Sequence, residues 1–331
     1  MSFRYSWAIF LIALLVSCQK NDSLLIESII GSTEVVRAEI SATPLPKTET
    51  EPDLFETQVA VSPIPTIQLC LDETNCISEG HFFLGNPISG HGNQFVDQTY
   101  RYGNTQNKTR ESHHGVEFPN KEGIPVLAVY DGEVIFAGSD AEHKIAWVPN
   151  FYGNVVVIRH NIEGVRLPIY SLYGHLKDVT VAKGQQIHLG KMIGTVGATG
   201  SAVGSHLHFE IRIGYNNYSA NQNPVLWMRP KDGMGVLAGV VKSEDGDPKE
   251  ALLNIQRVNN GNLEKDPYTS IEPYEKTLLP AMPDIILREN FAVGDMPVGD
   301  YRISMVYDGN VYEQFFRIVE GKLTFIIFNV H

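Results

Sequence analysis

The chain has 331 residues, of which 43% are hydrophobic, and it carries a formal net charge of −12. This length exceeds one ordinary domain and suits two folded domains with additional tails. The acidic balance argues against nucleic-acid binding, which needs a basic footprint, and the 29 glycines and 18 prolines indicate a turn-rich, β-dominated chain.

The N-terminus has the pattern of a secretory signal. Arg4 precedes an apolar run from Trp7 to Val16, which is too short to cross a bilayer core of roughly 30 Å as a helix. The run ends in LVSC, which resembles the lipobox of bacterial lipoproteins. That resemblance implies a signal peptide over residues 1–17, acylation of Cys18, and a lipid anchor on the outer face of the cell membrane, or in the periplasm or outer membrane of a diderm cell. A plain signal peptide with an incidental cysteine is the alternative.

Residues 18–77 are rich in Ser, Thr, Pro and Glu and lack sustained periodicity, which predicts a flexible stalk between the lipid and the folded part. Cys70 and Cys76 lie at its end, and outside the cytoplasm a short-loop disulfide between them is expected. Because no other cysteine is left in the mature chain after Cys18, any metal site must use histidine, aspartate or glutamate.

Residues 78–230 alternate short apolar runs with glycine-bearing turns, and no segment keeps a 3.6-residue apolar period over a dozen residues. This pattern predicts an all-β domain. Two apolar runs flank Asp131-Gly132 in IPVLAVYDGEVIFAG, which predicts a β-hairpin. Residues 235–331 again show short strands at turn spacing, and they predict a second, smaller β-domain.

Histidines mark three segments of the first domain. In SHLHFEI, His206 and His208 alternate with Leu207, so on a strand both imidazoles face one side and Leu207 faces the core. Taken alone, such a pair is more often structural than metal-binding.

The other two segments are HHGVEF and YGHL. His113 and Glu117 would lie about 13 Å apart in a fully extended strand, but Gly115 permits a bend that brings them within reach of one metal ion. His114 would point away from His113, as a neighbour on the groove wall. His175 ends an apolar strand, where a lone histidine is usually structural.

Together HHGVEF, YGHL and GATGSAVGSHLHFE, in this order, resemble the lysostaphin-type (LytM-like) zinc metallopeptidases that cut peptidoglycan. The resemblance runs from about Tyr100 to Pro224. It implies an all-β, antiparallel-sheet fold with an active-site groove across the sheet and one zinc ion at the floor of that groove.

The resemblance also implies roles for five residues. His113, Glu117 and His208 would be the zinc ligands. His206 would be the general base, and His175 would stabilise the oxyanion or help proton transfer to the leaving amine. The family usually has aspartate where this chain has Glu117, so the extra methylene puts the strength of zinc binding in question.

The C-terminal block resembles a prealbumin-like or carboxypeptidase-regulatory-like β-sandwich through its turns at Gly239–Pro248 and Pro297–Tyr301. That resemblance implies a binding or spacer module without catalysis. A surface-attached binding protein whose function lies in this module is one further hypothesis.

The motifs together predict a zinc-dependent endopeptidase that hydrolyses peptide bonds in the stems or cross-links of bacterial peptidoglycan. The alternative is a non-catalytic relative that binds cell-wall peptides or activates another wall hydrolase. The expected partners are peptidoglycan peptides and the membrane, with no nucleic acid. A monomer is the default expectation for the oligomeric state.

Overall fold

The computed structural model describes residues 75–274 and 277–331. The signal peptide, Cys18, Cys70 and most of the expected stalk therefore lie outside the described residues. The described part contains eighteen strands and two short 3₁₀ turns, η1 (Tyr218–Ala220) and η2 (Pro224–Leu226), which confirms the all-β fold class. In this part of the chain, no helix has the length and apolar character needed to cross a membrane.

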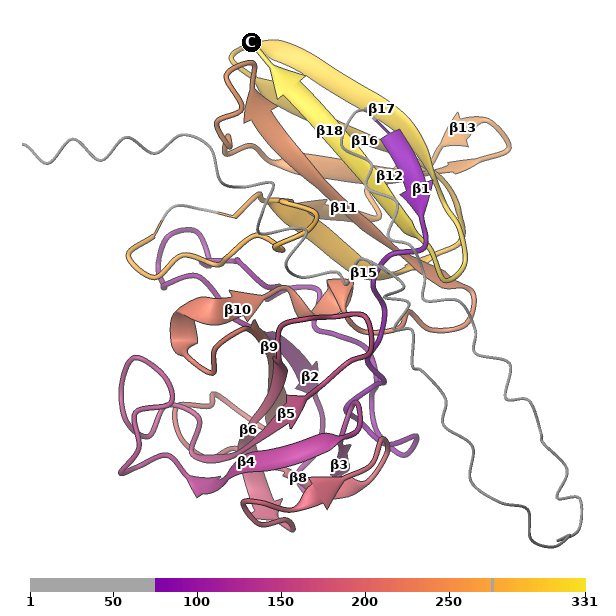
Figure 1. Ribbon diagram of the computed structural model, residues 1–331. Coiled ribbons are helices and arrows are strands. Elements are labelled where there is room, and N and C mark those ends of the chain that lie inside the picture. The colour runs from indigo at the N-terminus through magenta and orange to yellow at the C-terminus, as the bar shows by residue number, and fades with distance from the viewer. Residues whose placement is uncertain (1–74, 275–276) are drawn as a thin grey trace, which may run out of the picture.

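Strands β2 to β10 form one nine-stranded sheet in which every pairing is antiparallel (Figure 1). Its main order is β10-β9-β6-β5-β4-β7; β2 pairs with β9, and β8 pairs with β6 and β3. The bounds are β2 Val116–Pro119, β3 Pro125–Leu127, β4 Gly132–Ser139, β5 Asn154–His160, β6 Ile169–Val179, β7 Gln186–Ile187, β8 Met192–Val196, β9 His206–Ile213 and β10 Asn221–Gln222.

The predicted hairpin around Asp131-Gly132 is wrong. β3 pairs with β8, whereas β4 pairs with β5 and β7. Gly132 lies within β4, where a Cβ would come within 2.4 Å of the Arg159 carbonyl oxygen, so this glycine permits close strand approach rather than a turn. Asp131 Oδ1 accepts a hydrogen bond from Leu189 N at 2.7 Å and thereby holds the loop before β8.

The remaining strands form two further sheets, ordered β1-β18-β11-β15 and β13-β12-β16-β17, with β14 on β12. We call these two sheets and their loops the C-terminal sandwich, because their inner faces share one buried core. The bounds are β1 Asn75–Ser78, β11 Met234–Ser243, β12 Leu253–Asn259, β13 Asn262–Leu263, β14 Thr269–Ile271, β15 Phe291–Pro297, β16 Gly299–Tyr307, β17 Asn310–Ile318 and β18 Leu323–Val330.

Strand β1 corrects the predicted end of the stalk. Residues 75–77 were expected to be flexible, but Asn75–Ser78 pair antiparallel with β18 near the other end of the chain. Four residues are too few to show a period in the sequence, and their partner lies more than 240 positions away. Cys76 in this strand is disulfide-bonded. The chain thus contributes a strand to the C-terminal sandwich before it enters the nine-stranded sheet.

The sheet that contains β11 is buried on both faces. Leu237 and Val241 of β11 belong to the core of the C-terminal sandwich, whereas Val236 and Ala238 belong to the core beneath the nine-stranded sheet. Successive side chains on a strand point to opposite faces, so this one sheet serves both cores. Figure 1 shows the nine-stranded sheet and the C-terminal sandwich stacked directly on each other.

Candidate metal and catalytic site

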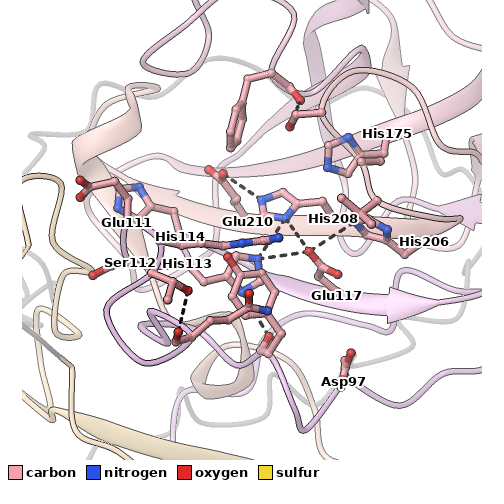
Figure 2. A pocket seen from close by; sticks show the side chains of 18 of the residues that line it. Asp97, Glu111, Ser112, His113, His114, Glu117, His175, His206, His208 and Glu210 are labelled. Carbon is pink, nitrogen blue, oxygen red and sulfur yellow. Dashed lines mark hydrogen bonds and ion pairs between the residues drawn. The ribbon is translucent and has the colours of Figure 1, made fainter.

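The five residues singled out in the sequence line one groove of about 810 Å³ (Figure 2). His113 lies just before β2 and Glu117 within it, His175 lies in β6, and His206 and His208 lie in β9. These segments are brought together because β9 lies between β6 on one edge and β2 on the other.

The register between β2 and β9 places the carboxylate. Glu117 is paired directly with His208, so both side chains lie on the same face. Gly115 contributes by its lack of a side chain: a Cβ there would come within 2.6 Å of Phe209 O and 2.8 Å of the His208 ring. Leu207, on the opposite face of β9, is fully buried in the core, as the alternation predicts.

The candidate metal ligands are His113, Glu117 and His208, here called the ligand triad, and their nitrogen and oxygen atoms lie close enough to hold one metal ion. His113 Nε2 is 3.3 Å from His208 Nδ1 and 3.6 Å from Glu117 Oε1, and His208 Nδ1 is 4.0 Å from the same oxygen. A tetrahedral zinc site with bonds near 2 Å separates its ligand atoms by about 3.3 Å. His113, Glu117 and His208 therefore need only small movements to bind zinc.

Hydrogen bonds on the far side of each ring orient the ligand nitrogens. His113 Nδ1 donates to the carbonyls of Tyr100 and Arg101, at 3.2 and 3.3 Å, and His208 Nε2 donates to Glu210 Oε1 at 3.1 Å. With those protons assigned, His113 Nε2 and His208 Nδ1 each present a lone pair to the other. Two facing lone pairs beside a carboxylate are the donor set of a cation site.

The protonation states also suit a metal. Burial, with the neighbouring His208, lowers the pKa of His113 to about 3. Burial alone would raise the pKa of Glu117, but the rings of His206, His113 and His208 outweigh it and hold that pKa at about 2. At neutral pH the site thus offers a neutral imidazole and an ionised carboxylate, the forms that bind zinc.

Glu210 supports His208 and was missed in the sequence. It is fully buried, and its second oxygen accepts from Arg212 Nε at 2.9 Å, while Tyr152 OH donates to its first. Arg212 also donates to Tyr152 OH at 2.8 Å. The alternation of side chains along the strand could have revealed Glu210, because positions 206, 208, 210 and 212 share one face of β9.

His175 and His206 lie beside the ligand triad, with ring centroids 4.9 Å apart. His175 has φ of +61° at a bulge in β6 and donates from Nδ1 to Thr199 O at 2.8 Å; a left-handed histidine of this kind is typical of functional sites. His206 Nδ1 donates to Gly204 O at 3.1 Å. Its buried Nε2 lies 3.3 Å from Glu117 Oε1 without a hydrogen bond of good geometry. Each ring therefore keeps one nitrogen free to accept a proton.

Comparison with known families agrees with this geometry. Residues 111–224 match the model of Peptidase family M23. The chain is 39% identical over 101 residues to the DD-carboxypeptidase/endopeptidase Mpg of Neisseria meningitidis serogroup B, covering 30% of this chain and 20% of that protein. We call the nine-stranded sheet and its loops the nine-stranded domain.

Two further relatives and one solved structure show the range of the match. The chain is 30% identical over 188 residues to the peptidoglycan DD-endopeptidase ShyB of Vibrio cholerae, covering 53% of this chain and 38% of that protein. It is 32% identical over 107 residues to the murein hydrolase activator NlpD of Escherichia coli, covering 32% of this chain and 24% of that protein. The catalytic domain of lysostaphin from Staphylococcus simulans matches at 28% identity and a TM-score of 0.30, over 34% of this chain and 76% of that one. The chain thus spans less than two-fifths of these curated relatives.

His114 lines the same groove, but both of its nitrogens are occupied. Asn221 Nδ2 donates to Nδ1 at 3.2 Å, and Nε2 donates to the Leu279 carbonyl at 2.9 Å. Its ring packs against Tyr218, with centroids 4.0 Å apart. This histidine is therefore held as part of the wall, with no nitrogen left to bind a metal or to accept a proton.

Proposed function

We propose that the chain is a zinc-dependent endopeptidase that hydrolyses peptide bonds in the stems or cross-links of bacterial peptidoglycan. The observation that carries the proposal is that the triad of candidate ligands lies in one groove with two further histidines, each with a free nitrogen. The similarity to Mpg, a DD-carboxypeptidase/endopeptidase, supports the reaction class, and the similarity to ShyB, a peptidoglycan DD-endopeptidase, supports the substrate class.

His113, Glu117 and His208 would hold one zinc ion. When bound, zinc supplies Lewis-acid polarisation of the scissile carbonyl and lowers the pKa of water toward neutrality. Glu210 keeps the Nε2 proton of His208 in place and leaves Nδ1 free, which fixes the ring in the orientation that the ligand needs.

His206 and His175 would move the protons. A general base needs a free lone pair near the attacking water, and His206 Nε2 offers one beside Glu117. His175 is neutral because burial, with the neighbouring His208 and His206, lowers its pKa to about 3. Its Nδ1 donates a hydrogen bond to Thr199 O, which leaves Nε2 facing the groove to help proton transfer to the leaving amine.

A second candidate is a non-catalytic protein that binds wall peptides or activates another wall hydrolase. The match to the murein hydrolase activator NlpD favours it, as does the glutamate at position 117 where the resemblance leads us to expect aspartate. The retained triad and both histidines favour the enzyme.

One experiment separates the two candidates. Residues 19–331 would be purified, their zinc content measured, and peptidoglycan fragments followed by mass spectrometry. Zinc-dependent release of peptide fragments that is abolished by a chelator and by His206→Ala supports the enzyme. A protein that binds no zinc and releases no fragments, yet stays bound to peptidoglycan, supports the non-catalytic candidate.

For the location, we propose export and acylation of Cys18, with the C-terminal sandwich as a binding or spacer module. The LVSC sequence supports the anchor, and the relative named lipoprotein NlpD/LppB homolog from Pseudomonas aeruginosa is consistent with it. The full chain and Cys18→Ser would be expressed in a bacterium and partitioned in detergent. Recovery of both proteins in the aqueous phase contradicts the anchor.

A further inference from the structure

The C-terminal sandwich contacts the two loops that position His113. These are residues 98–104, whose carbonyls accept from the His113 ring, and residues 111–114, which carry His113 itself. Neither loop contains a strand, so neither takes its shape from sheet pairing. Two backbone hydrogen bonds tie them together, from His113 N to Asn104 O at 3.1 Å and from Gly103 N to His113 O at 2.8 Å.

The first set of contacts reaches residues 111–114. Leu279 of the C-terminal sandwich donates its backbone N–H to Glu111 Oε2 at 3.1 Å and accepts from His114 Nε2 at 2.9 Å. Thr277 Oγ1 lies 3.1 Å from Ser112 Oγ. Residues on both sides of His113 are therefore bonded to one short segment of the C-terminal sandwich, and Figure 2 shows Glu111, Ser112 and His114 beside the ligand triad.

The second set of contacts reaches residues 98–104. The Arg101 guanidinium donates to Thr269 Oγ1 at 2.5 Å and to Ser270 O at 3.1 Å, both in β14. Arg101 also supplies one of the carbonyls that accept from His113 Nδ1. Tyr102 OH lies 2.8 Å from Met282 O and 2.9 Å from Met282 N, so it both donates and accepts.

Packing leaves little freedom at this contact. Gly103 has φ of +78°, and a Cβ there would come within 2.3 Å of the Tyr274 ring of the C-terminal sandwich. Tyr102 is 3% exposed and Ser112 is 2% exposed. A polar group buried without its partner is costly, so these hydrogen bonds restrict where the two loops, and hence His113, can lie.

We propose that the C-terminal sandwich is a positioning part of the metal site, in which Thr269 and Thr277 hold the loops that present His113. The inference rests on the proposed function in that His113 is taken as a zinc ligand. It assigns to the C-terminal sandwich a role in the geometry of the groove, beyond that of a spacer or an independent binding module.

The test removes two hydroxyl groups from the C-terminal sandwich and leaves the sequence of the nine-stranded domain unchanged. In the chain from residue 19 onward, Thr269→Val with Thr277→Val keeps side-chain shape and β propensity but deletes one hydrogen-bond partner of Arg101 and the hydroxyl that Ser112 contacts. We expect the zinc dissociation constant to rise about tenfold, at the lower end of the range for outer-shell substitutions. Amide hydrogen exchange within residues 98–115 should accelerate in the zinc-free protein, and Thr269→Ser with Thr277→Ser should restore both properties.

Thr324→Val is the matched control, because Thr324 Oγ1 is a buried hydroxyl of the same sandwich that bonds Arg317 O at 2.7 Å, within the sandwich itself. It should lower the melting temperature without changing exchange in residues 98–115 or zinc affinity. Unchanged exchange and zinc affinity in the double valine variant would overturn the inference. If the wild type binds no zinc, the proposed function fails, while the exchange measurement still decides whether the C-terminal sandwich orders these loops.

Discussion

Glu117 and His208 are direct partners across the antiparallel strands β2 and β9, with Glu117 Oε1 4.0 Å from His208 Nδ1. A slip of one residue in this pairing would carry Glu117 to the other face of the sheet. Two of the three proposed ligands are thus fixed by the register of the core sheet, while His113 is fixed by loops. The carboxylate and the first histidine depend on different parts of the fold.

Shortening or neutralising the carboxylate at 117 should weaken zinc binding to different degrees. Glu117→Gln removes the charge, and we expect zinc affinity to fall more than about 100-fold, beyond the range of outer-shell substitutions. Glu117→Asp keeps the charge but shortens the side chain by about 1.5 Å on a strand held by four paired residues. We expect a loss of about tenfold for this variant, measured by competition with a chromophoric chelator. Tighter zinc binding by the aspartate variant would show that β2 shifts to meet the metal.

Replacing Glu210 should affect both zinc affinity and stability. Glu210→Gln removes the charge that faces His208 and Arg212, so we expect zinc affinity to fall about tenfold. Because Arg212 is then buried without a counter-charge, the free energy of unfolding should fall by about 3–5 kcal/mol. The double variant Glu210→Gln with Arg212→Met removes the unpaired charge. It should regain stability in urea titrations but not zinc affinity; recovery of both would mean that Glu210 only stabilises the fold.

Much of the site could be predicted from local sequence. The HxH alternation places His206 and His208 on one face by strand geometry alone, and those rings, with Glu117, do line one groove. The same alternation extends to Glu210 and Arg212, which is why they could have been found. Gly115 was expected to supply a bend, yet its observed role is to let the His208 ring approach, a fact that depends on a strand more than ninety residues away.

Long-range pairing could not be predicted. The Asp131-Gly132 dipeptide is a strong local signal for a hairpin, but the two flanking strands find other partners, and Gly132 is needed inside β4. Strand β1 is too short to show a period in the sequence, so its pairing with β18 could not be predicted. The contact of Leu279 with His114 joins segments 165 residues apart through a backbone carbonyl. Because a residue of any type at position 279 could supply that carbonyl, the sequence carries no signal for the contact.

Replacing His206 should lower activity without removing zinc, whereas replacing a residue of the ligand triad should remove both. His206→Gln removes the proposed base, and we expect kcat/KM on a peptidoglycan fragment to fall about 10²- to 10⁴-fold, the usual contribution of general acid–base catalysis. Zinc stoichiometry, measured by atomic absorption, should stay at one ion per chain. His113→Gln is the comparison, because it should lose both zinc and activity. Loss of zinc in the His206 variant would place that residue among the ligands.

His160 should make the zinc-free protein sensitive to acid. This buried histidine donates from Nδ1 to Asp131 O at 2.8 Å and lies 2.7 Å from Ser171 Oγ, away from the ligand triad. Burial lowers its pKa to about 4, from an ordinary value of 6.5. Between these values the unfolded chain binds a proton that the folded protein does not, so stability falls as pH decreases from 6.5 toward 4.

The sign and size of this effect are measurable by urea unfolding in the presence of a chelator. Between pH 7 and pH 4.5, His160 should cost the wild type about 2 kcal/mol of unfolding free energy. His160→Gln is expected to be less stable than the wild type at pH 7, but its loss between the two pH values should be smaller by that amount. The acid sensitivity that remains would come from other groups with lowered pKa values, among them His113 and His175, whose pKa values are lowered to about 3. Equal pH dependence in the two proteins would mean that His160 is protonated in the folded state at pH 4.5.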